Sequence, residues 1–259
     1  MQPILNIAIR AARKAGTVIT RAIDQIETLT VTQKGRHDFV SEIDRRAEDE
    51  IIHIIRKTYP SHGILAEESG ELKGDDTVWI IDPLDGTTNF LHGFPQFAVS
   101  IGIRNRNRLE HGLIYDPLRD ELFTASFGEG AQLNGRRLRV SKTNSLENSL
   151  LGTGFPFREI SQMDEYLAIF RSIMPDCSGI RRAGAASLDL AYVAAGRLDG
   201  FWEFGLKPWD MAAGAVIIQE AGGLVGDAHG ANNFMQTGDM VAGNPKVFAA
   251  LLQRIQESR

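Results

Sequence analysis

The strand and helix patterns of this sequence change in kind near its middle. Apolar residues recur at steps of three and four over residues 1–27, and again from Ile43 to Ile54, which predicts two amphipathic helices. Five segments rich in β-branched or aromatic residues follow: Gly63 to Ala66, Thr77 to Ile81, Phe97 to Arg104, Leu109 to Tyr115 and Glu121 to Ser126. Connections at Asn105 to Arg108 and at Asp116 to Arg119 are typical of hairpins, so the first half is predicted to form a largely antiparallel sheet.

The second half alternates strand and helix patterns. Its short strand patterns lie at Leu150 to Thr153, Gly179 to Arg182, Gly200 to Phe204, Gly223 to Gly226 and Met240 to Ala242. Helical patterns lie at Met163 to Ile173, Ser187 to Ala195, Trp209 to Glu220 and Lys246 to Ile255. Such alternation indicates an α/β layer with some parallel strands. No long linker occurs, so we expect one compact body whose halves, residues 1–145 and 146–259, meet between Ser141 and Asn148.

Composition narrows the class of protein. The 259 residues are enough to bury about 70 to 75% of the unfolded surface. A net charge of −5 argues against bulk electrostatic binding to nucleic acid. No run approaches the roughly 18 apolar residues of a membrane span, and the N-terminus lacks the pattern of a leader peptide. The single cysteine, Cys177, excludes an internal disulfide. We therefore expect a cytoplasmic globular protein without a membrane partner or direct sequence-specific binding to nucleic acid.

The most informative stretch runs from Trp79 to Phe90 and reads WIIDPLDGTTNF. An apolar strand delivers Asp82 at its end, Pro83 is expected to stop that strand, and a turn at Asp85 leads toward a helix N-terminus. Two carboxylates thus meet on one loop, beside backbone N–H groups of the kind that bind phosphate. Such oxygen ligands suit Mg²⁺, and the carbonyl of Leu84 can be one more. A surface Asp-Pro turn followed by an Asx cap is the alternative.

Two further acidic segments are candidates for the same site. Glu67 and Glu68 follow a short strand pattern, and a neighbouring strand end would bring one of them to the Asp82 loop. Asp210 follows Pro208 at the start of a helical pattern, from which its carboxylate can project toward a cation. Each segment also has an ordinary interpretation. The first can be a pair of exposed loop acids, and the second can be an acid that interacts favourably with the helix dipole.

These acidic segments carry a family resemblance. The stretches from Glu67 to Ser69, from Trp79 to Phe90 and from Trp209 to Gly214 resemble the three metal-site motifs of the inositol monophosphatase family, which are Mg²⁺-dependent, lithium-sensitive phosphatases. The similarity covers nearly the whole chain, and Gly179 to Gly200 most resembles the bacterial extragenic-suppressor branch. The resemblance implies a mixed α+β and α/β fold, a five-layer αβαβα sandwich with an antiparallel sheet first and a mixed sheet second. It also implies a homodimer.

The same resemblance implies a set of metal ligands and a reaction. Glu67, Asp82 and the carbonyl of Leu84 would hold one Mg²⁺, and Asp82, Asp85 and Asp210 would hold a second. The charge of these ligands leaves room for a third, weakly held Mg²⁺. The implied reaction is hydrolysis of myo-inositol monophosphate by a metal-activated water.

Catalytic and substrate-binding roles follow from the resemblance as well. Thr87 matches the threonine that helps to activate the attacking water, Asp44 matches the carboxylate behind it, and Glu67 completes this catalytic set. Asp44 also stands three residues after Ser41, so it can belong to a helix cap. The implied substrate-binding residues are Glu67, Leu84, Asp85, Gly86, Thr87, Arg181, Gly184, Ala185, Ala186, Glu203 and Asp210.

Two other positions have roles that the resemblance leaves open. Lys34 falls in a loop that approaches the metal site in relatives, but this loop is one residue shorter here than in the animal enzymes. Arg182 stands in the pair that matches the bacterial branch and is a candidate residue of a homodimer interface.

Other function classes compete with this one. A phosphatase that forms an aspartyl phosphate needs a second acid two residues before its Asp-Gly-Thr motif, where this chain has Pro83. No glycine-rich loop for nucleoside triphosphates occurs, and no two histidines stand at zinc-ligand spacing. Two alternatives stay open: a phosphatase of other sugar or nucleotide monophosphates, or a protein that mainly binds RNA polymerase or an antitermination factor in ribosomal RNA transcription.

Overall fold

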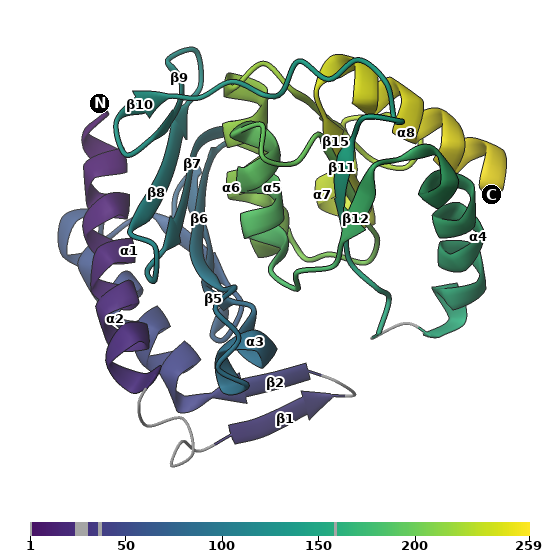
Figure 1. Cartoon of the computed structure of the whole chain (residues 1–259). Helices are drawn as coiled ribbons and strands as arrows, with labels where there is room; N and C mark the ends of the chain where they lie inside the picture. Colours follow the sequence, from purple (N-terminus) through teal and green to yellow (C-terminus); the bar gives the residue numbers. More distant parts are fainter. Residues whose placement is uncertain (1, 24–30, 36–37, 158–159) are drawn as a thin grey trace.

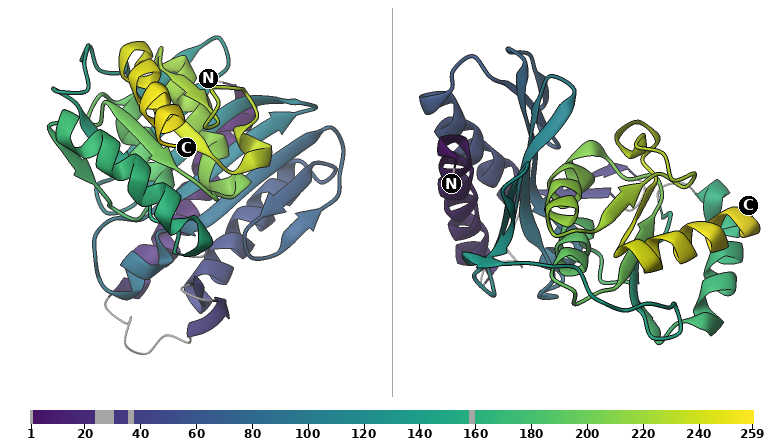
Figure 2. Two further views of the ribbon diagram at one scale, coloured as in Figure 1. Left: turned by 90° about the vertical axis from the view of Figure 1, so that its right-hand side faces the viewer. Right: turned by 90° about the horizontal axis from the view of Figure 1, so that it is seen from above.

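Two large β-sheets alternate with three layers of helices (Figure 1). The structure, a computed structural model, describes residues 2–23, 31–35, 38–157 and 160–259. The helix layers contain α1 (Pro3–Ala22) with α2 (Glu42–Thr58), α5 (Ala186–Ala194) with α6 (Pro208–Glu220), and α4 (Met163–Ile173) with α8 (Pro245–Ser258). The view from above in Figure 2 shows the same succession of helices, sheet, helices, sheet and helices. The predicted five-layer αβαβα sandwich is therefore confirmed.

The first sheet has eight strands in the order β10-β9-β8-β7-β6-β5-β3-β4. These strands are β3 (Gly63–Ala66), β4 (Gly70–Leu72), β5 (Thr77–Asp85), β6 (Ala98–Asn105), β7 (Arg108–Asp116), β8 (Glu121–Ser126), β9 (Gly130–Leu133) and β10 (Arg136–Arg137). Every neighbouring pair is antiparallel except β3 and β5, which are parallel. The sheet is thus largely antiparallel, as predicted, although the short strands β4, β9 and β10 lacked a recognisable pattern in the sequence.

The second sheet has five strands in the order β12-β11-β13-β15-β14. These are β11 (Leu150–Thr153), β12 (Gly179–Arg181), β13 (Gly200–Glu203), β14 (Leu224–Gly226) and β15 (Met240–Gly243). Strand β11 runs parallel to both of its neighbours, β12 and β13, whereas β15 is antiparallel to β13 and β14. The mixed sheet follows from the helices that connect its parallel strands, because a parallel pair requires a crossover connection.

One local prediction was wrong. Pro83 was expected to stop the strand before it, but β5 continues to Asp85. The pairing of β5 with β6 becomes irregular between Asp82 and Asp85 and then resumes with Asp85 opposite Ala98. Pro83 lacks a backbone N–H, and the irregularity is a place where the strand does not need one. The carboxylates of Asp82 and Asp85 are consequently held on strand backbone rather than on a free loop.

Some helix and hairpin bounds also differ from the sequence expectation. The first helix was predicted over residues 1–27 and ends at Ala22, while residues 24–30 lie outside the described part of the chain. A hairpin of β1 (Val31–Gly35) and β2 (Asp38–Ser41) precedes α2, and Lys34 lies on its first strand. The short helices α3 (Thr87–Leu91), α7 (Phe234–Thr237), η2 (Ile160–Gln162) and η3 (Met174–Asp176) complete the described elements.

Helix α6 lies unusually close to the first sheet. A Cβ atom added to Gly102 on β6 would lie 2.6 Å from the Cβ atom of Ala212, and one added to Gly112 on β7 would lie 2.4 Å from the carbonyl oxygen of Ala213. At these distances the strands accept no side chain, so the two glycines let the helix backbone approach. The approach buries the whole segment Met211 to Ile218 and fixes the start of α6 against the sheet.

Among the described residues, no helix combines the length and the apolar character that crossing a bilayer requires.

Replacing Gly102 with alanine tests this close approach. The added methyl group would overlap Ala212, so we expect the free energy of unfolding to fall by about 1–3 kcal/mol in urea denaturation. Gly179→Ala is the matched control, because the nearest atom there is the guanidinium end of Arg181 at 3.3 Å, which can move. Equal stability of the two variants would contradict the tight contact under α6.

Candidate active site

A cavity of about 450 Å³ opens between the two sheets. It lies where β5, α3, β13 and the start of α6 meet. Its walls include most of the residues that the sequence selected: Glu67, Asp82, Leu84, Asp85, Gly86, Thr87, Gly184, Ala186, Glu203 and Asp210. Segments separated by more than a hundred residues in the sequence therefore share one cavity.

The end of β5 forms the floor of the cavity through local hydrogen bonds. The backbone N–H of Leu84 donates to Oδ1 of Asp82 at 3.0 Å, which fixes one carboxylate oxygen over its own turn. Gly86 follows with φ of 91°, and a Cβ atom there would lie 2.8 Å from the carbonyl oxygen of Gln96. Glycine is the residue that meets both requirements. The turn therefore brings Thr87 directly after the two aspartates.

The Thr87 hydroxyl lies 2.7 Å from Oδ1 of Asp44 and 3.1 Å from the carbonyl oxygen of Leu84. Asp44 projects from α2 and is 1% exposed. The hydroxyl has one proton to donate, and its oxygen retains lone pairs that can accept a hydrogen bond from water. This buried carboxylate and partly exposed hydroxyl are the pair that the sequence proposed for catalysis.

Two of the cavity acids are held by the first turns of helices. Oδ2 of Asp85 accepts hydrogen bonds from the backbone N–H of Ser187 at 2.7 Å and from its hydroxyl at 2.5 Å, both at the start of α5. Oδ2 of Asp210 accepts the backbone N–H of Lys207 at 2.7 Å, which caps α6. Asp210 therefore stands in the first turn of α6, where the sequence placed an acid that interacts with the helix dipole, and it also lines the cavity. Sequence reasoning did not select Ser187, since its contact spans 102 residues.

The opposite wall combines an acid, a cation and two aromatic rings. Glu203 ends β13 and lies against Gly154, where a Cβ atom would be 1.9 Å from the Glu203 carboxyl carbon. The guanidinium carbon of Arg182 lies 5.5 Å from the ring centroid of Phe155 and 4.9 Å from that of Phe157. Among the described residues that line the cavity, Arg182 is the one cation. This wall therefore presents both charged and aromatic groups to the cavity.

Three positions selected from the sequence lie elsewhere. Arg181 is exposed, donates to the carbonyl oxygen of its neighbour Ile180 at 3.1 Å, and is absent from the described cavity lining. Ala185 is buried behind the lining residues Gly184 and Ala186. Lys34 belongs to strand β1, and residues 36–37 of the loop in which the sequence placed it lie outside the described residues. Arg182, which the sequence offered for a dimer interface, lines the cavity instead of Arg181.

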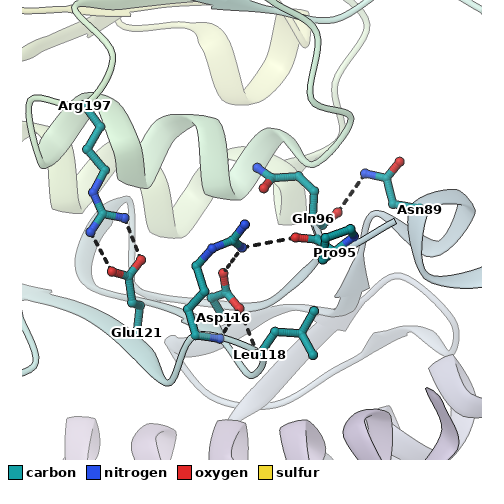
Figure 3. Close-up of polar contacts among 8 residues, drawn as sticks. Asn89, Pro95, Gln96, Asp116, Leu118, Glu121 and Arg197 are labelled. Atoms are coloured by element: carbon teal, nitrogen blue, oxygen red, sulfur yellow. Dashed lines mark hydrogen bonds and ion pairs between the residues drawn. The ribbon is translucent and has the colours of Figure 1, made fainter. Parts of the chain in front are cut away.

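One side-chain amide, that of Asn89, connects the cavity to its surroundings. Asn89 Nδ2 donates to the carbonyl oxygens of Gln96 at 2.7 Å and Ala183 at 2.9 Å, so one amide joins segments from the two halves of the chain. Figure 3 shows Asn89 pointing at the Gln96 carbonyl, next to Pro95. The Pro95 carbonyl in turn accepts a hydrogen bond from Arg119 on the β7–β8 turn at 3.1 Å. No pattern in the sequence predicted this connection.

The other acids of the cavity raise the proton affinity of Asp82. Burial raises the pKa of Asp82 well above its usual range, and repulsion from Glu67, Asp85 and Asp210 raises the pKa further. Among the described residues, no three acidic, histidine or cysteine side chains lie close enough together to hold a metal ion. Glu67, Asp82, Asp85 and Asp210 line one cavity, but their carboxylates do not converge on a single point.

Another buried acid, Asp189, lies next to this set. Asp189 on α5 is 2% exposed, and its pKa is raised well above the usual range by burial and by repulsion from Asp85, against the opposite effect of Arg182. Sequence reasoning did not select Asp189, because its neighbours along the helix are apolar.

Comparisons with known proteins cover the whole chain. The model of the inositol monophosphatase family matches residues 1–259. Nus factor SuhB of Pseudomonas aeruginosa is 59% identical over 262 residues, which cover 99% of this chain and 97% of the relative. The extragenic suppressor protein suhB of Bartonella henselae superposes with a TM-score of 0.97 at 45% identity and covers 100% of both chains.

A third relative, SaIMPase-II, has been solved with two different ligands. With inositol monophosphate bound it is 30% identical, with a TM-score of 0.82, covering 97% of this chain and 94% of the relative. With 2′AMP bound it is 28% identical, with a TM-score of 0.80, covering 100% of both chains.

Asp189 gives a testable pH dependence. Because its folded-state pKa lies above the usual 3.8, the folded protein binds more protons than the unfolded chain above that pH, and the free energy of unfolding decreases as pH rises. Asp189→Asn removes this dependence. We expect urea denaturation with a chelator, from about pH 4 to pH 7, to show a stability advantage of the variant that grows with pH, by at most about 1.4 kcal/mol per pH unit.

Glu147 is exposed, so Glu147→Gln is the control for the loss of one negative charge. Parallel stability curves for wild type and Asp189→Asn would contradict the raised pKa.

Proposed function

Since the chain belongs to the inositol monophosphatase family, we propose that it hydrolyses phosphate monoesters in this cavity, with myo-inositol monophosphate as substrate and Mg²⁺ as cofactor. The observation that carries the proposal is the meeting of four carboxylates with Thr87 in one cavity, where the buried Asp44 accepts the Thr87 hydroxyl proton in a hydrogen bond. The relative with inositol monophosphate bound supports the choice of substrate. The relative with 2′AMP bound keeps nucleotide monophosphates as alternative substrates.

The donor set fits a hard divalent cation. Carboxylate and carbonyl oxygens are the ligands that Mg²⁺ prefers, and here Glu67, Asp82, Asp85, Asp210 and the carbonyl of Leu84 offer them. We propose that these residues hold two Mg²⁺, with a third held more weakly. Bound cations supply positive charge against the phosphoryl oxygens and the leaving alkoxide. The repulsion that raises the pKa of Asp82 is what such positive charge would relieve.

The protein's own part is to position water and to move a proton. A water beside Thr87 can donate to the hydroxyl oxygen while the hydroxyl proton is directed at Asp44, 2.7 Å away. Asp44 is buried, so its orientation toward Thr87 does not depend on solvent. We infer that Thr87 orients the attacking water and that Asp44 receives the proton.

The wall opposite the acids would bind the leaving group. Glu203 lies at the end of β13 and can accept hydrogen bonds from the hydroxyls of a polyol. Gly184 has φ of 86°, and a Cβ atom there would lie 2.8 Å from Nη1 of Arg182. The absence of a side chain at Gly184 therefore leaves room for the inositol ring beside Arg182. We propose Glu203, Gly184, Ala186 and Arg182 as substrate contacts, with Arg182 in place of Arg181.

Asp85→Asn tests the catalytic proposal. The asparagine oxygen can still accept from Ser187, so the fold should persist while one metal-binding charge is lost. We expect Mg²⁺-dependent phosphate release to fall by at least about 100-fold. The assay compares inositol, sugar and nucleotide monophosphates with and without lithium, and Asp164→Asn, an exposed acid on α4, is the control. Undiminished turnover by Asp85→Asn would overturn the metal assignment.

A second role in transcription is supported by the names of the relatives. The Pseudomonas aeruginosa protein that matches 99% of this chain is named a Nus factor. We propose that this chain acts in the cytoplasm as a homodimer and also binds RNA polymerase or an antitermination factor during ribosomal RNA transcription.

The same Asp85→Asn variant separates the two roles. If partner binding uses a surface away from the cavity, the variant should bind the transcription complex with the affinity of the wild type in a pull-down with purified components. Loss of binding would instead tie both roles to the cavity. Sedimentation of both proteins would check that the oligomeric state is unchanged.

A further inference from the structure

A buried carboxylate holds the turn that carries Glu67, and the proposed catalysis does not use it. Glu48 lies on α2 and is 2% exposed. Its Oε2 accepts the backbone N–H of Glu68 at 2.9 Å, and its Oε1 accepts the backbone N–H of Ser69 at 2.8 Å. Each carboxylate oxygen thus receives one N–H from the two residues that directly follow Glu67. A carboxylate has acceptors on both oxygens, so it matches two converging donors.

The position of Glu48 on α2 is equally specific. Asp44 and Glu48 are four residues apart, so they share one face of the helix. Asp44 accepts the hydrogen bond from Thr87, whereas Glu48 accepts from the turn after Glu67. One face of α2 therefore fixes both the hydroxyl of the catalytic pair and the turn of a cavity acid.

The turn needs such support because of where it lies. It connects β3 to the three-residue strand β4, which is the last strand at this edge of the eight-stranded sheet. On its other side, the backbone N–H of Glu67 donates to the carbonyl oxygen of Ile81 at 3.1 Å. Glu67 also faces the like charge of Asp82, which would push the turn away from the cavity.

We propose that Glu48 is a positioning residue for divalent-cation binding: its carboxylate anchors the Glu68 and Ser69 amides so that Glu67 is presented to the cation at the cavity. The inference rests on the proposed function, because it assumes that Glu67 is a metal ligand. It assigns to Glu48 a contribution to cation affinity rather than to proton transfer or substrate recognition.

Glu48→Gln is the informative variant. Glutamine keeps the size and shape of the side chain, but its Nε2 group is a donor and must face one of the two N–H groups. One hydrogen bond is therefore lost in either orientation of the amide. Glu50→Gln is the matched control, since Glu50 lies on the same helix and the substitution removes the same charge. Oε1 of Glu50 lies 3.7 Å from Nζ of Lys14, and Glu50 is not among the residues that line the cavity.

Two measurements on the full chain test the proposal. In metal-free protein, amide hydrogen exchange of Glu68 and Ser69 should be at least about tenfold faster in Glu48→Gln than in wild type or Glu50→Gln. Calorimetric titration should show Mg²⁺ affinity weakened by about 10- to 100-fold in Glu48→Gln alone. The kcat at saturating Mg²⁺ should stay within about threefold of the wild type, because the reacting groups are unchanged.

The outcomes separate this role from the proposed function. Unchanged Mg²⁺ affinity in Glu48→Gln would overturn the positioning role. A lower unfolding temperature of the variant would not support the role, because the loss of a merely structural hydrogen bond also lowers that temperature. Unchanged exchange at Glu68 and Ser69 would overturn it as well. If the wild-type chain binds no Mg²⁺, the proposed function itself fails, and this role fails with it.

Discussion

Repulsion among the acids of one cavity is the constraint on which the rest of this structure depends. Glu67, Asp82, Asp85 and Asp210 carry like charges, and burial strengthens their interaction. Such a group stays together only where fixed donors hold each member. The structure supplies these donors mainly from the backbone: the N–H of Leu84, of Ser187 and of Lys207. The scaffold therefore fixes the positions of the charges before any cation or substrate is considered, which is how a preorganised site works.

The layers of the fold bring these donors together. Strand β5 comes from the first sheet, Ser187 begins a middle-layer helix, and Lys207 precedes α6, whose contact with Gly102 and Gly112 sets its distance from the sheet. The hydroxyl of Ser100 on β6 also donates to the carbonyl of Trp209 at 3.1 Å, which ties the first turn of α6 to the strand beside β5. The cavity is thus built across layers, and no single element contains it.

The sequence predicted what depends on periodicity and on local motifs. The longer strands and helices, the two kinds of sheet and the cavity acids near Asp82 could be read from spacing and from the family resemblance. Contacts between distant segments could not. Ser187 and Glu48 stand in ordinary helical patterns, and their partners lie 102 residues and about 20 residues away. The sequence also did not show that Arg182 rather than Arg181 lines the cavity, because Arg182 follows the end of β12 and its position depends on the turn after that strand. Pro83 was expected to end its strand, but β5 continues through Pro83, where its pairing with β6 is irregular.

The glycines beneath α6 limit how this protein can change over time. A larger residue at 102 would need a smaller one at 212, but 212 is already alanine, and the one smaller residue, glycine, weakens a helix. At 112 the obstacle is the backbone of Ala213 itself, so no substitution on the helix can compensate. A larger residue at position 102 or 112 can therefore be accommodated only if α6 and the middle helix layer move away from the first sheet. Such a movement would carry Asp210 away from the other acids. Sequence variation at 102 and 112 would consequently be a marker of relatives in which the cavity has been rebuilt or has lost its chemistry.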